Sequence, residues 1–482
     1  MDTFFYTLYF VVFIFLTIVF TLVRRRGCHV DKAKLPPGSF GWPVMGETFE
    51  FLFGKPENFV TDRMKKFSPD IFKTRVLGEK TVVICGPNGN KFLFANENKL
   101  FTAFRPVPMT RLFRSYKDKA SQSASRDEAG EKALRQPGFL KPEALVGYLG
   151  KMDTIIQELF QAHWQGKYDV KASPFAKTVT LTLACRFFMG TDDAGKIARL
   201  IKHFDDVTQG MHSIVLDFPG MVFYRANKAA AAIRKELSVV ISNKKKEVAS
   251  VMASSSGQKP VLMDILSYMI LATDPNGKFM PEAELADKMM GLLVAGYSTV
   301  ATAITFLMKY VGENPDIYNL IRQEQMEIAA SKKLGELLQW ADVQKMKYSW
   351  NVICETMRLT PPLQGTFREV LQDFTYAGYT IPKGWKLYWT MSSTNKDPSY
   401  FKDPEKFDPS RYEEDIVPYT YVPFGGGPRT CPGKEYARFA ILAFLHNVVK
   451  RYSWELTMPD EKIIGDMMPT PANGLPIRLY HL

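Results

Sequence analysis

An uncharged apolar run lies near the N-terminus of the chain. Residues 3–23 contain no charged side chain, and Arg24, Arg25 and Arg26 follow directly. A helix of this length spans roughly 30 Å, which matches the hydrocarbon core of a bilayer. The arginines act as a stop-transfer signal, and the positive-inside rule places everything after them in the cytosol. A cleaved signal peptide is the alternative, but the run is long and no small-residue cleavage site is visible.

The rest of the chain alternates between strand and helix patterns. Residues 71–77 and 81–85 are rich in β-branched side chains and flank a predicted hairpin turn at 78–80. Residues 140–250 are mostly helical in pattern. A long helix is predicted from about 281 to 310, and because it is apolar on nearly all sides it should be central and buried. These patterns predict a mainly α fold with a small β-rich part.

Two proline-containing segments mark the edges of the predicted parts. Leu35–Gly38 is a stiff turn that separates an anchor and hinge, residues 1–35, from one catalytic body, residues 36–482. Residues 214–224 form an apolar loop that Pro219 interrupts. This loop is either buried or dips into the membrane beside the anchor.

Composition and charge exclude several classes of protein. Apolar residues make up 46% and charged residues 23% of 482, which is ordinary globular usage. The five cysteines are odd in number and form no CxxC pair, which argues against a disulfide framework or a zinc finger. The net charge is +12. Because no basic cluster is interleaved with aromatic residues, an anionic membrane or an acidic protein is a better partner than nucleic acid.

The strongest chemical signal is the segment Phe424–Gly433, FGGGPRTCPG. Its glycines let the backbone pass close to a bulky flat group. Cys431 stands just before a predicted helix, and the helix N-terminus together with Arg429 is expected to favour its thiolate. A thiolate held against a flat group suggests ligation of haem iron. The alternative is a buried structural cysteine in a glycine turn.

This segment resembles the cysteine-loop signature of the haem-thiolate monooxygenases, the cytochromes P-450. The resemblance implies that Cys431 is the axial ligand of a haem b iron. It also implies that Phe424, Gly425, Arg429 and Gly433 contact this cofactor. The resemblance extends over nearly the whole chain.

Two further motifs agree with the family in order and spacing. Glu355 and Arg358 resemble its Glu-x-x-Arg motif, and Arg411 resembles the arginine that joins this pair. The resemblance implies a structural role for all three residues. Read alone, Glu355 and Arg358 would be a surface pair that contributes little stability.

Three arginines are candidates for binding the haem propionates, because a guanidinium pairs with a carboxylate in a fork geometry. Arg429 and Arg368 match the positions of the family's arginines. Arg135 matches a third position, but Glu131 stands where an aromatic partner is expected. An ordinary surface arginine is the alternative for Arg135.

The segment Ala295–Thr299 resembles the family's oxygen-activation motif. Small residues at 295 and 296 would leave a groove for dioxygen, and Thr299 could donate a hydrogen bond that helps to break the O–O bond. Ser298 replaces the expected acid, so we expect slower or leakier turnover. The alternative is that both hydroxyls are bonded back to the preceding turn.

Within the family, residues 35–39, 46–48, 62–67 and 139–145 resemble a plant clan that oxidises sterols and terpenoids, most closely the triterpene oxidases and the conifer taxane hydroxylases. This predicts hydroxylation of an unactivated C–H bond in a cyclic terpenoid by O2. An NADPH-dependent flavin reductase would supply electrons, docking near Lys434 and Arg438. The enzyme would be a single-pass protein of the endoplasmic reticulum membrane that faces the cytosol.

Two other functions remain open. One is a lyase or isomerase that rearranges a hydroperoxide without a reductase, which the missing acid at Ser298 favours. The other is a haem-loaded but catalytically idle protein that binds a terpenoid or a partner enzyme.

Overall fold

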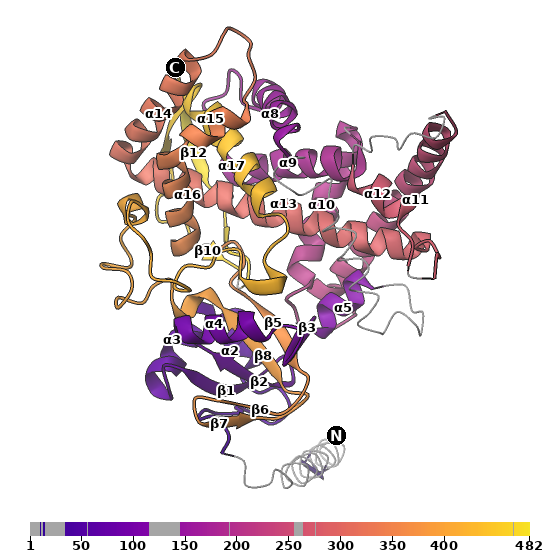
Figure 1. Ribbon diagram of the computed structural model, residues 1–482, viewed down its shortest axis with the longest axis vertical. Coiled ribbons are helices and arrows are strands. Elements are labelled where there is room, and N and C mark those ends of the chain that lie inside the picture. The colour runs from indigo at the N-terminus through magenta and orange to yellow at the C-terminus, as the bar shows by residue number, and fades with distance from the viewer. Residues whose placement is uncertain are drawn as a thin grey trace, which may run out of the picture. The chain divides into compact units, whose positions relative to one another are not determined.

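The chain divides into two compact units. The computed structural model describes residues 10, 13–14, 34–54, 56–114, 145–191, 193–254, 264–274, 276–465 and 467–482. Unit 1 consists of Met1–Arg105 and Gly365–Thr394, and unit 2 of Pro106–Gln364 and Asn395–Leu482. Most of the predicted anchor, including its arginines, lies outside the described residues. Helices dominate unit 2 and a sheet dominates unit 1 (Figure 1), which confirms the predicted fold class.

Unit 1 is built on a five-stranded sheet with the order β1-β2-β8-β5-β3. β1 and β2 form an antiparallel hairpin in which Val76 pairs with Glu79. Leu77 and Gly78 have φ angles of 53° and 79°, the left-handed values that a tight two-residue turn requires. The predicted hairpin is therefore confirmed, but its turn is at 77–78 rather than 78–80.

The other strands of unit 1 come from two parts of the sequence. β2 pairs with β8 in parallel, whereas β8 with β5 and β5 with β3 are antiparallel. The elements of unit 1 are α2 (Thr48–Phe53), α3 (Pro56–Lys66), β1 (Ile71–Val76), β2 (Glu79–Ile84), α4 (Gly86–Asn96), β3 (Phe101–Phe104), β5 (Gly365–Val370), β6 (Phe374–Tyr376), β7 (Tyr379–Ile381), β8 (Lys386–Thr390) and the 3-10 turn Met391–Ser393.

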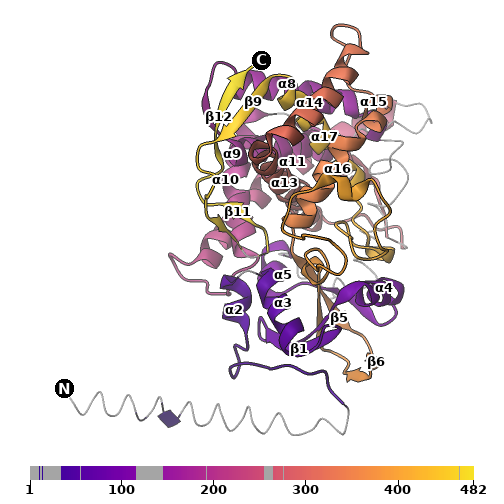
Figure 2. The same ribbon diagram turned by 90° about the vertical axis from the view of Figure 1, so that its left-hand side faces the viewer.

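Unit 2 is a helical body whose centre is α13 (Glu282–Glu313). Figures 1 and 2 show this helix crossing unit 2 among the other helices. The helices around it are α5 (Val107–Phe113), α8 (Leu149–His163), α9 (Ala172–Ala184), the π-helix Cys185–Met189, α10 (Ala194–Gly210), α11 (Val222–Ser254), α12 (Ile265–Leu271), α14 (Pro315–Ala330), α15 (Trp340–Lys345), α16 (Lys347–Leu359) and α17 (Lys434–Val449).

The central helix confirms the prediction for residues 281–310. Glu282 and Glu284 lie in its first turn, where negative side chains interact favourably with the helix dipole and stabilise the helix. Among the described residues, it is the one helix long and apolar enough to cross a membrane, yet 67% of its most apolar window is buried in unit 2. It is therefore the core helix of a globular body, and the main apolar cluster of the unit surrounds it.

Short strands and turns complete unit 2. One sheet has the order β4-β12-β9, and β10 pairs with β11. These elements are β4 (Asp169–Lys171), the 3-10 turns Pro409–Tyr412 and Gly427–Arg429, β9 (Tyr452–Leu456), β10 (Ile463–Ile464), β11 (Thr470–Pro471) and β12 (Pro476–His481).

The apolar loop before α11 lies on the surface of unit 2. Leu216, Phe218 and Met221 are 44%, 64% and 44% exposed. The first of the two predicted alternatives, a buried loop, is therefore wrong. An exposed cluster of this kind indicates a surface that meets an apolar environment.

A buried histidine gives unit 2 an acid-sensitive stability. His446 on α17 is 2% exposed, with Nδ1 at 2.8 Å from Gln325 Oε1 and Nε2 at 3.2 Å from Lys450 Nζ. An ammonium can only donate, so Nε2 accepts and the ring is neutral. Burial, with the charge of Lys450, lowers the pKa of His446 to about 3.

We expect the free energy of unfolding to fall as the pH drops from 6.5 towards 3. The unfolded chain binds a proton on His446 in this range and the native state does not, so the native state loses about 1.4 kcal/mol per pH unit from this group. Urea unfolding at several pH values measures the slope. The same slope in His446→Gln would show that this histidine is not its source.

Candidate functional site

Cys431 lies on an accessible loop of unit 2 that precedes α17. Its amide donates to the Phe424 carbonyl at 2.9 Å and so closes the loop, while the Phe424 side chain packs against the apolar core. Gly425 and Gly427 have φ angles of 68° and 64°, which side chains with a Cβ rarely adopt. Gly433 caps the N-terminus of α17. Phe424 therefore anchors the loop, and the glycines let it turn.

The side chain of Cys431 is exposed, whereas Cys85, Cys185 and Cys354 are buried. The predicted alternative for Cys431, a buried structural cysteine, is therefore wrong. An accessible sulfur at the tip of a fixed loop is suited to ligate a metal in a group that packs against the loop.

The protein by itself does not favour the thiolate of Cys431. Cys431 is accessible at the tip of the loop, but the surrounding protein partly desolvates its sulfur, and this desolvation raises the pKa of the thiol more than the Gly433 amide and the Lys434 charge lower it. The expected lowering by the helix N-terminus and Arg429 is thus wrong in its net direction. A bound metal cation would reverse the balance, because coordination deprotonates a thiol.

The buried helix α13 has one accessible stripe, which we call the open stripe. Its members share one helix face, at spacings of three and four residues. They are Leu292, Ala295, Gly296, Thr299 and Thr302, of which Ala295 is exposed and the others are partly exposed.

The open stripe lies next to the helix that follows Cys431. A Cβ built on Gly296 would stand 3.8 Å from the ring of Tyr436 on α17. Ala295 on this stripe is small and exposed, so it leaves room for a bulky flat group, whereas Phe188 fills the space where a Cβ of Gly296 would stand. The residues present in unit 2 therefore fit the haem that the motif predicts.

The two hydroxyls of the predicted oxygen-activation motif bond to the preceding turn. Ser298 donates to the Val294 carbonyl at 3.0 Å and contacts Met468 Sδ at 3.8 Å. Thr299 donates to the Ala295 carbonyl at 2.7 Å. This is the alternative that the sequence left open. Thr299 still reaches the open stripe, whereas Ser298 is buried.

Replacing Gly296 with alanine should destabilise unit 2 by about 1–3 kcal/mol, the usual cost of overpacking. The new Cβ would lie 2.7 and 2.9 Å from two ring atoms of Phe188. Urea unfolding measures the change. Gly291→Ala on the same helix is the matched control, because its Cβ would meet nothing within 4 Å and alanine favours helix. Equal stabilities of the two variants would contradict the predicted contact.

Glu355, Arg358 and Arg411 form one cluster in unit 2. The side chains of Glu355 and Arg358 are fully buried, with Nε–Oε2 and Nη2–Oε1 distances of 2.7 and 2.8 Å. Arg411 Nε donates to Glu355 Oε1 at 3.2 Å. The surface pair that the sequence alone suggested is therefore wrong, because segments far along the chain cover both groups.

The three arginines predicted to bind the propionates lie in different parts of the chain. Arg429 is partly buried in the cysteine loop. Arg368 lies on β5 of unit 1, where Nε donates to Glu97 Oε1 and Nη1 donates to Thr366 Oγ1 at 2.9 Å. Glu97 thus balances the charge of Arg368, which the sequence did not indicate. Arg135 and Glu131 lie outside the described residues.

Sequence reasoning also missed a polar contact behind the motif. Tyr297 on α13 is fully buried, and its hydroxyl donates to Asp205 Oδ1 of α10 at 2.8 Å. Lys177 of α9 donates to the same oxygen at 2.7 Å. Burial, with the nearby charge of Asp205, raises the pKa of Tyr297 well above its usual value. The one signal was a tyrosine in an apolar helix, which usually needs a partner for its hydroxyl.

Comparisons with known proteins agree with this geometry. A family model described as Cytochrome P-450 matches residues 36–478. The chain is 49% identical over 486 residues to a beta-amyrin 28-monooxygenase of Vitis vinifera, covering 100% of this chain and 99% of the relative. A beta-amyrin 28-monooxygenase of Medicago truncatula is 50% identical, covering 98% and 97%. A cyanobacterial protein solved with bound retinoic acid has a TM-score of 0.82 and 32% identity, covering 94% of this chain and 100% of that chain.

Proposed function

The chain belongs to the cytochrome P-450 family, and from this membership we propose that it is a membrane-anchored monooxygenase that hydroxylates an unactivated C–H bond of a cyclic triterpenoid. One observation carries the substrate class: relatives named beta-amyrin 28-monooxygenase share 49% and 50% of residues over nearly the full chain. The monooxygenase reaction and the haem cofactor follow from the family. The diterpenoid that the sequence left open has no comparable support.

Residues of the cysteine loop in unit 2 would bind the haem. When bound, haem supplies the iron that activates dioxygen. Cys431 would hold the iron through its sulfur, Phe424, Gly425 and Gly433 would shape the loop that carries this sulfur, and Arg429 would pair with a propionate.

The open stripe of α13 would border the bound cofactor. Ala295 would leave space there, and Thr299 would pass a proton once its hydroxyl leaves the Ala295 carbonyl. Ser298 cannot act as a carboxylate would. The roles of Arg135 and Arg368 towards the propionates remain predictions from the resemblance.

A redox partner must supply two electrons, and we infer an NADPH-dependent flavin reductase. Lys434 is exposed at the start of α17, three residues after Cys431, and a positive side chain there suits an acidic partner. Arg438 contributes less free charge than the sequence suggested. It lies 3.7 Å from Glu435 and stacks over the ring of Trp350 at 5.2 Å.

Membrane attachment is inferred from apolar surface in each unit. In unit 2 the exposed loop at Leu216, Phe218 and Met221 supports it, and in unit 1 Trp42 and Phe53 are 79% and 73% exposed. Together with the uncharged run at 3–23, they favour a single-pass protein of the endoplasmic reticulum membrane with its catalytic body in the cytosol.

Product analysis tests the proposed function. Microsomes that contain the chain are fed beta-amyrin or a diterpene scaffold, with and without added reductase and NADPH. We expect an oxygenated triterpene that requires both NADPH and the reductase. A product formed from a hydroperoxide without NADPH would favour a lyase or isomerase instead. Spectral binding of beta-amyrin without any product would favour an idle binding protein. The named monooxygenase relatives support neither alternative.

A further inference from the structure

We propose that a small pocket between α9, α13 and β11 binds one water molecule, which delivers protons to the open stripe through the hydroxyl of Thr302. The inference rests on the proposed monooxygenase function. It assigns a positioning role to residues outside the predicted motif, at a site where Ser298 replaces the usual acid.

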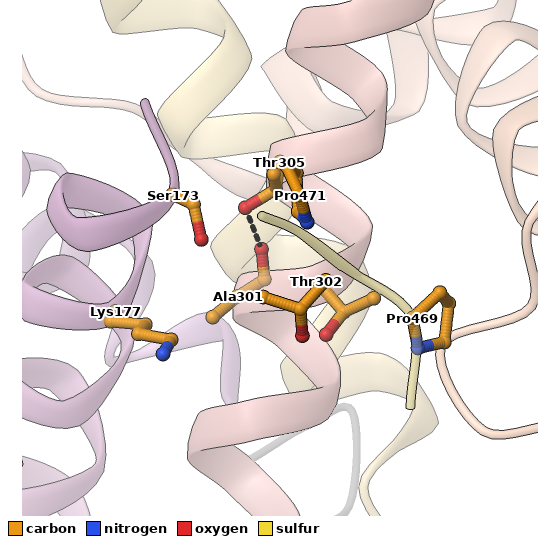
Figure 3. A pocket seen from close by; sticks show the side chains of 8 residues that line it. Ser173, Lys177, Ala301, Thr302, Thr305, Pro469 and Pro471 are labelled. Atoms are coloured by element: carbon orange, nitrogen blue, oxygen red, sulfur yellow. Dashed lines mark hydrogen bonds between the residues drawn. The ribbon is translucent and has the colours of Figure 1, made fainter. Parts of the chain in front are cut away.

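The pocket has the size and the chemistry of a water site. It measures about 10 Å³, which is roughly the space that one water centre needs. Figure 3 shows the side chains that line it. They are Ser173 and Lys177 of α9, Ala301, Thr302 and Thr305 of α13, and Pro469, Thr470 and Pro471.

The hydroxyls in the pocket are not equivalent. Thr305 already donates to the Ala301 carbonyl at 2.7 Å, a bond drawn in Figure 3. The side chains of Ser173 and Thr302 have no hydrogen bond among the described residues. Ser173 is 5% exposed, and its side chain lines the pocket, where its hydroxyl can bond to a water molecule.

Lys177 gives the water an orientation. Its ammonium donates to Asp205, which the hydroxyl of buried Tyr297 also holds. Two further N–H groups of the ammonium remain to donate into the pocket. A water that accepts from an ammonium turns its own O–H bonds away, towards Thr302 and Ser173. The proton path therefore has a direction, from the partly exposed Lys177 side towards α13.

Thr302 connects the pocket to the open stripe. It lines the pocket and also belongs to the stripe, three residues after Thr299 and four after Ser298. Both of these hydroxyls donate to backbone carbonyls. After either gives up a proton it must receive another, and no carboxylate at 298 can supply it. Thr302 is the neighbouring hydroxyl in contact with a water source.

The stoichiometry of the reaction fixes how many protons this path must deliver. Each hydroxylation consumes one substrate C–H, one O2, two electrons and two protons, and yields one alcohol and one water. Each proton that leaves the Thr302 oxygen is replaced by one from the pocket water. Solvent at the Lys177 side then replaces the proton lost by that water, so no oxidant beyond O2 and no additional reductant is needed.

The test is Thr302→Val, which keeps the shape of the side chain and removes the hydroxyl. A crystal structure of the wild-type holoenzyme should show a water within hydrogen-bond distance of Thr302 and Lys177, and the variant should lose it. Product per NADPH should fall on the order of tenfold, within the usual effect of one proton-transfer group. Peroxide release and the solvent isotope effect on product formation should rise, while KM stays unchanged.

Two variants separate a relay from a packing effect. Thr302→Ser restores a hydroxyl and should recover coupling and the isotope effect. Thr180→Val makes the same chemical change on α9, outside the pocket, at a hydroxyl that donates to the Ala176 carbonyl at 2.9 Å, and should behave as the wild type. Equal uncoupling in Thr302→Val and Thr180→Val would overturn the inference.

The crystallographic result separates this inference from the proposed function. If the wild type makes no oxygenated triterpene, the proposed function fails, and the water site is still decided by the crystal structure. A pocket without water in the wild type overturns the inference even when the enzyme is active. Unchanged coupling in Thr302→Val overturns it as well.

Discussion

Replacing Cys431 with serine should reduce product formation to the level of the enzyme-free control. It should also remove the thiolate-type carbon-monoxide difference spectrum. Cys431 is the exposed cysteine of the described residues, at the tip of a loop that Phe424 anchors. A serine hydroxyl would occupy the same position, but it would not be a thiolate. The electron donation by which a thiolate ligand favours O–O cleavage would therefore be lost. Difference spectra and product analysis on the same microsomes measure both effects.

The matched control is Cys85→Ala. Cys85 is 1% exposed and lies in unit 1, so its loss removes a small buried apolar group and leaves the ligand in place. This variant should keep the spectrum and most of the activity. A normal thiolate-type spectrum in Cys431→Ser would show that another group ligates the iron, and the site would be wrong.

Replacing Arg358 with lysine should destabilise unit 2 by about 2–6 kcal/mol, the cost of leaving two buried hydrogen-bond acceptors without a partner. The guanidinium makes five hydrogen bonds, two to Glu355 and three to the carbonyls of Asn395, Pro404 and Lys406. An ammonium has three donors and no planar fork, so at least two of these acceptors lose their partner. A large part of the protein should then be recovered without haem.

The comparison for Arg358 is an exposed pair in the same unit. Arg478 lies 3.0 Å from Asp169, and both side chains are at least half exposed. Arg478→Lys should leave the unfolding midpoint unchanged, since water screens such pairs. Urea unfolding and the haem-to-protein absorbance ratio measure both variants. Equal midpoints for Arg358→Lys and the wild type would show that the buried cluster does not hold the fold.

Local patterns were enough for several elements. The hairpin at 71–84, the helix at 282–313 and the loop at 424–433 were all predicted from neighbouring residues. These features depend on side-chain periodicity, turn chemistry and short motifs, which act over a few residues. The hairpin turn was misplaced because Leu77 adopts a left-handed φ of 53°, which its residue type does not suggest.

Contacts between distant segments were beyond such reasoning. Glu97 and Arg368 are 271 residues apart and meet through β3 and β5. Tyr297 meets Asp205 across 92 residues, and the pocket at Thr302 needs α9 and β11 together. No periodicity within one segment shows which other segment will cover it.

The sequence by itself determined the fold class, the cysteine loop and the family, because each depends on residues that stand together in the chain. Only the tertiary structure decided which of the motif residues are shielded from water. It buried Glu355 and Arg358, exposed Cys431 and Ala295, and turned Thr299 towards a backbone carbonyl. The strength of a charge pair and the pKa of a thiol depend on this shielding, which no single segment can impose.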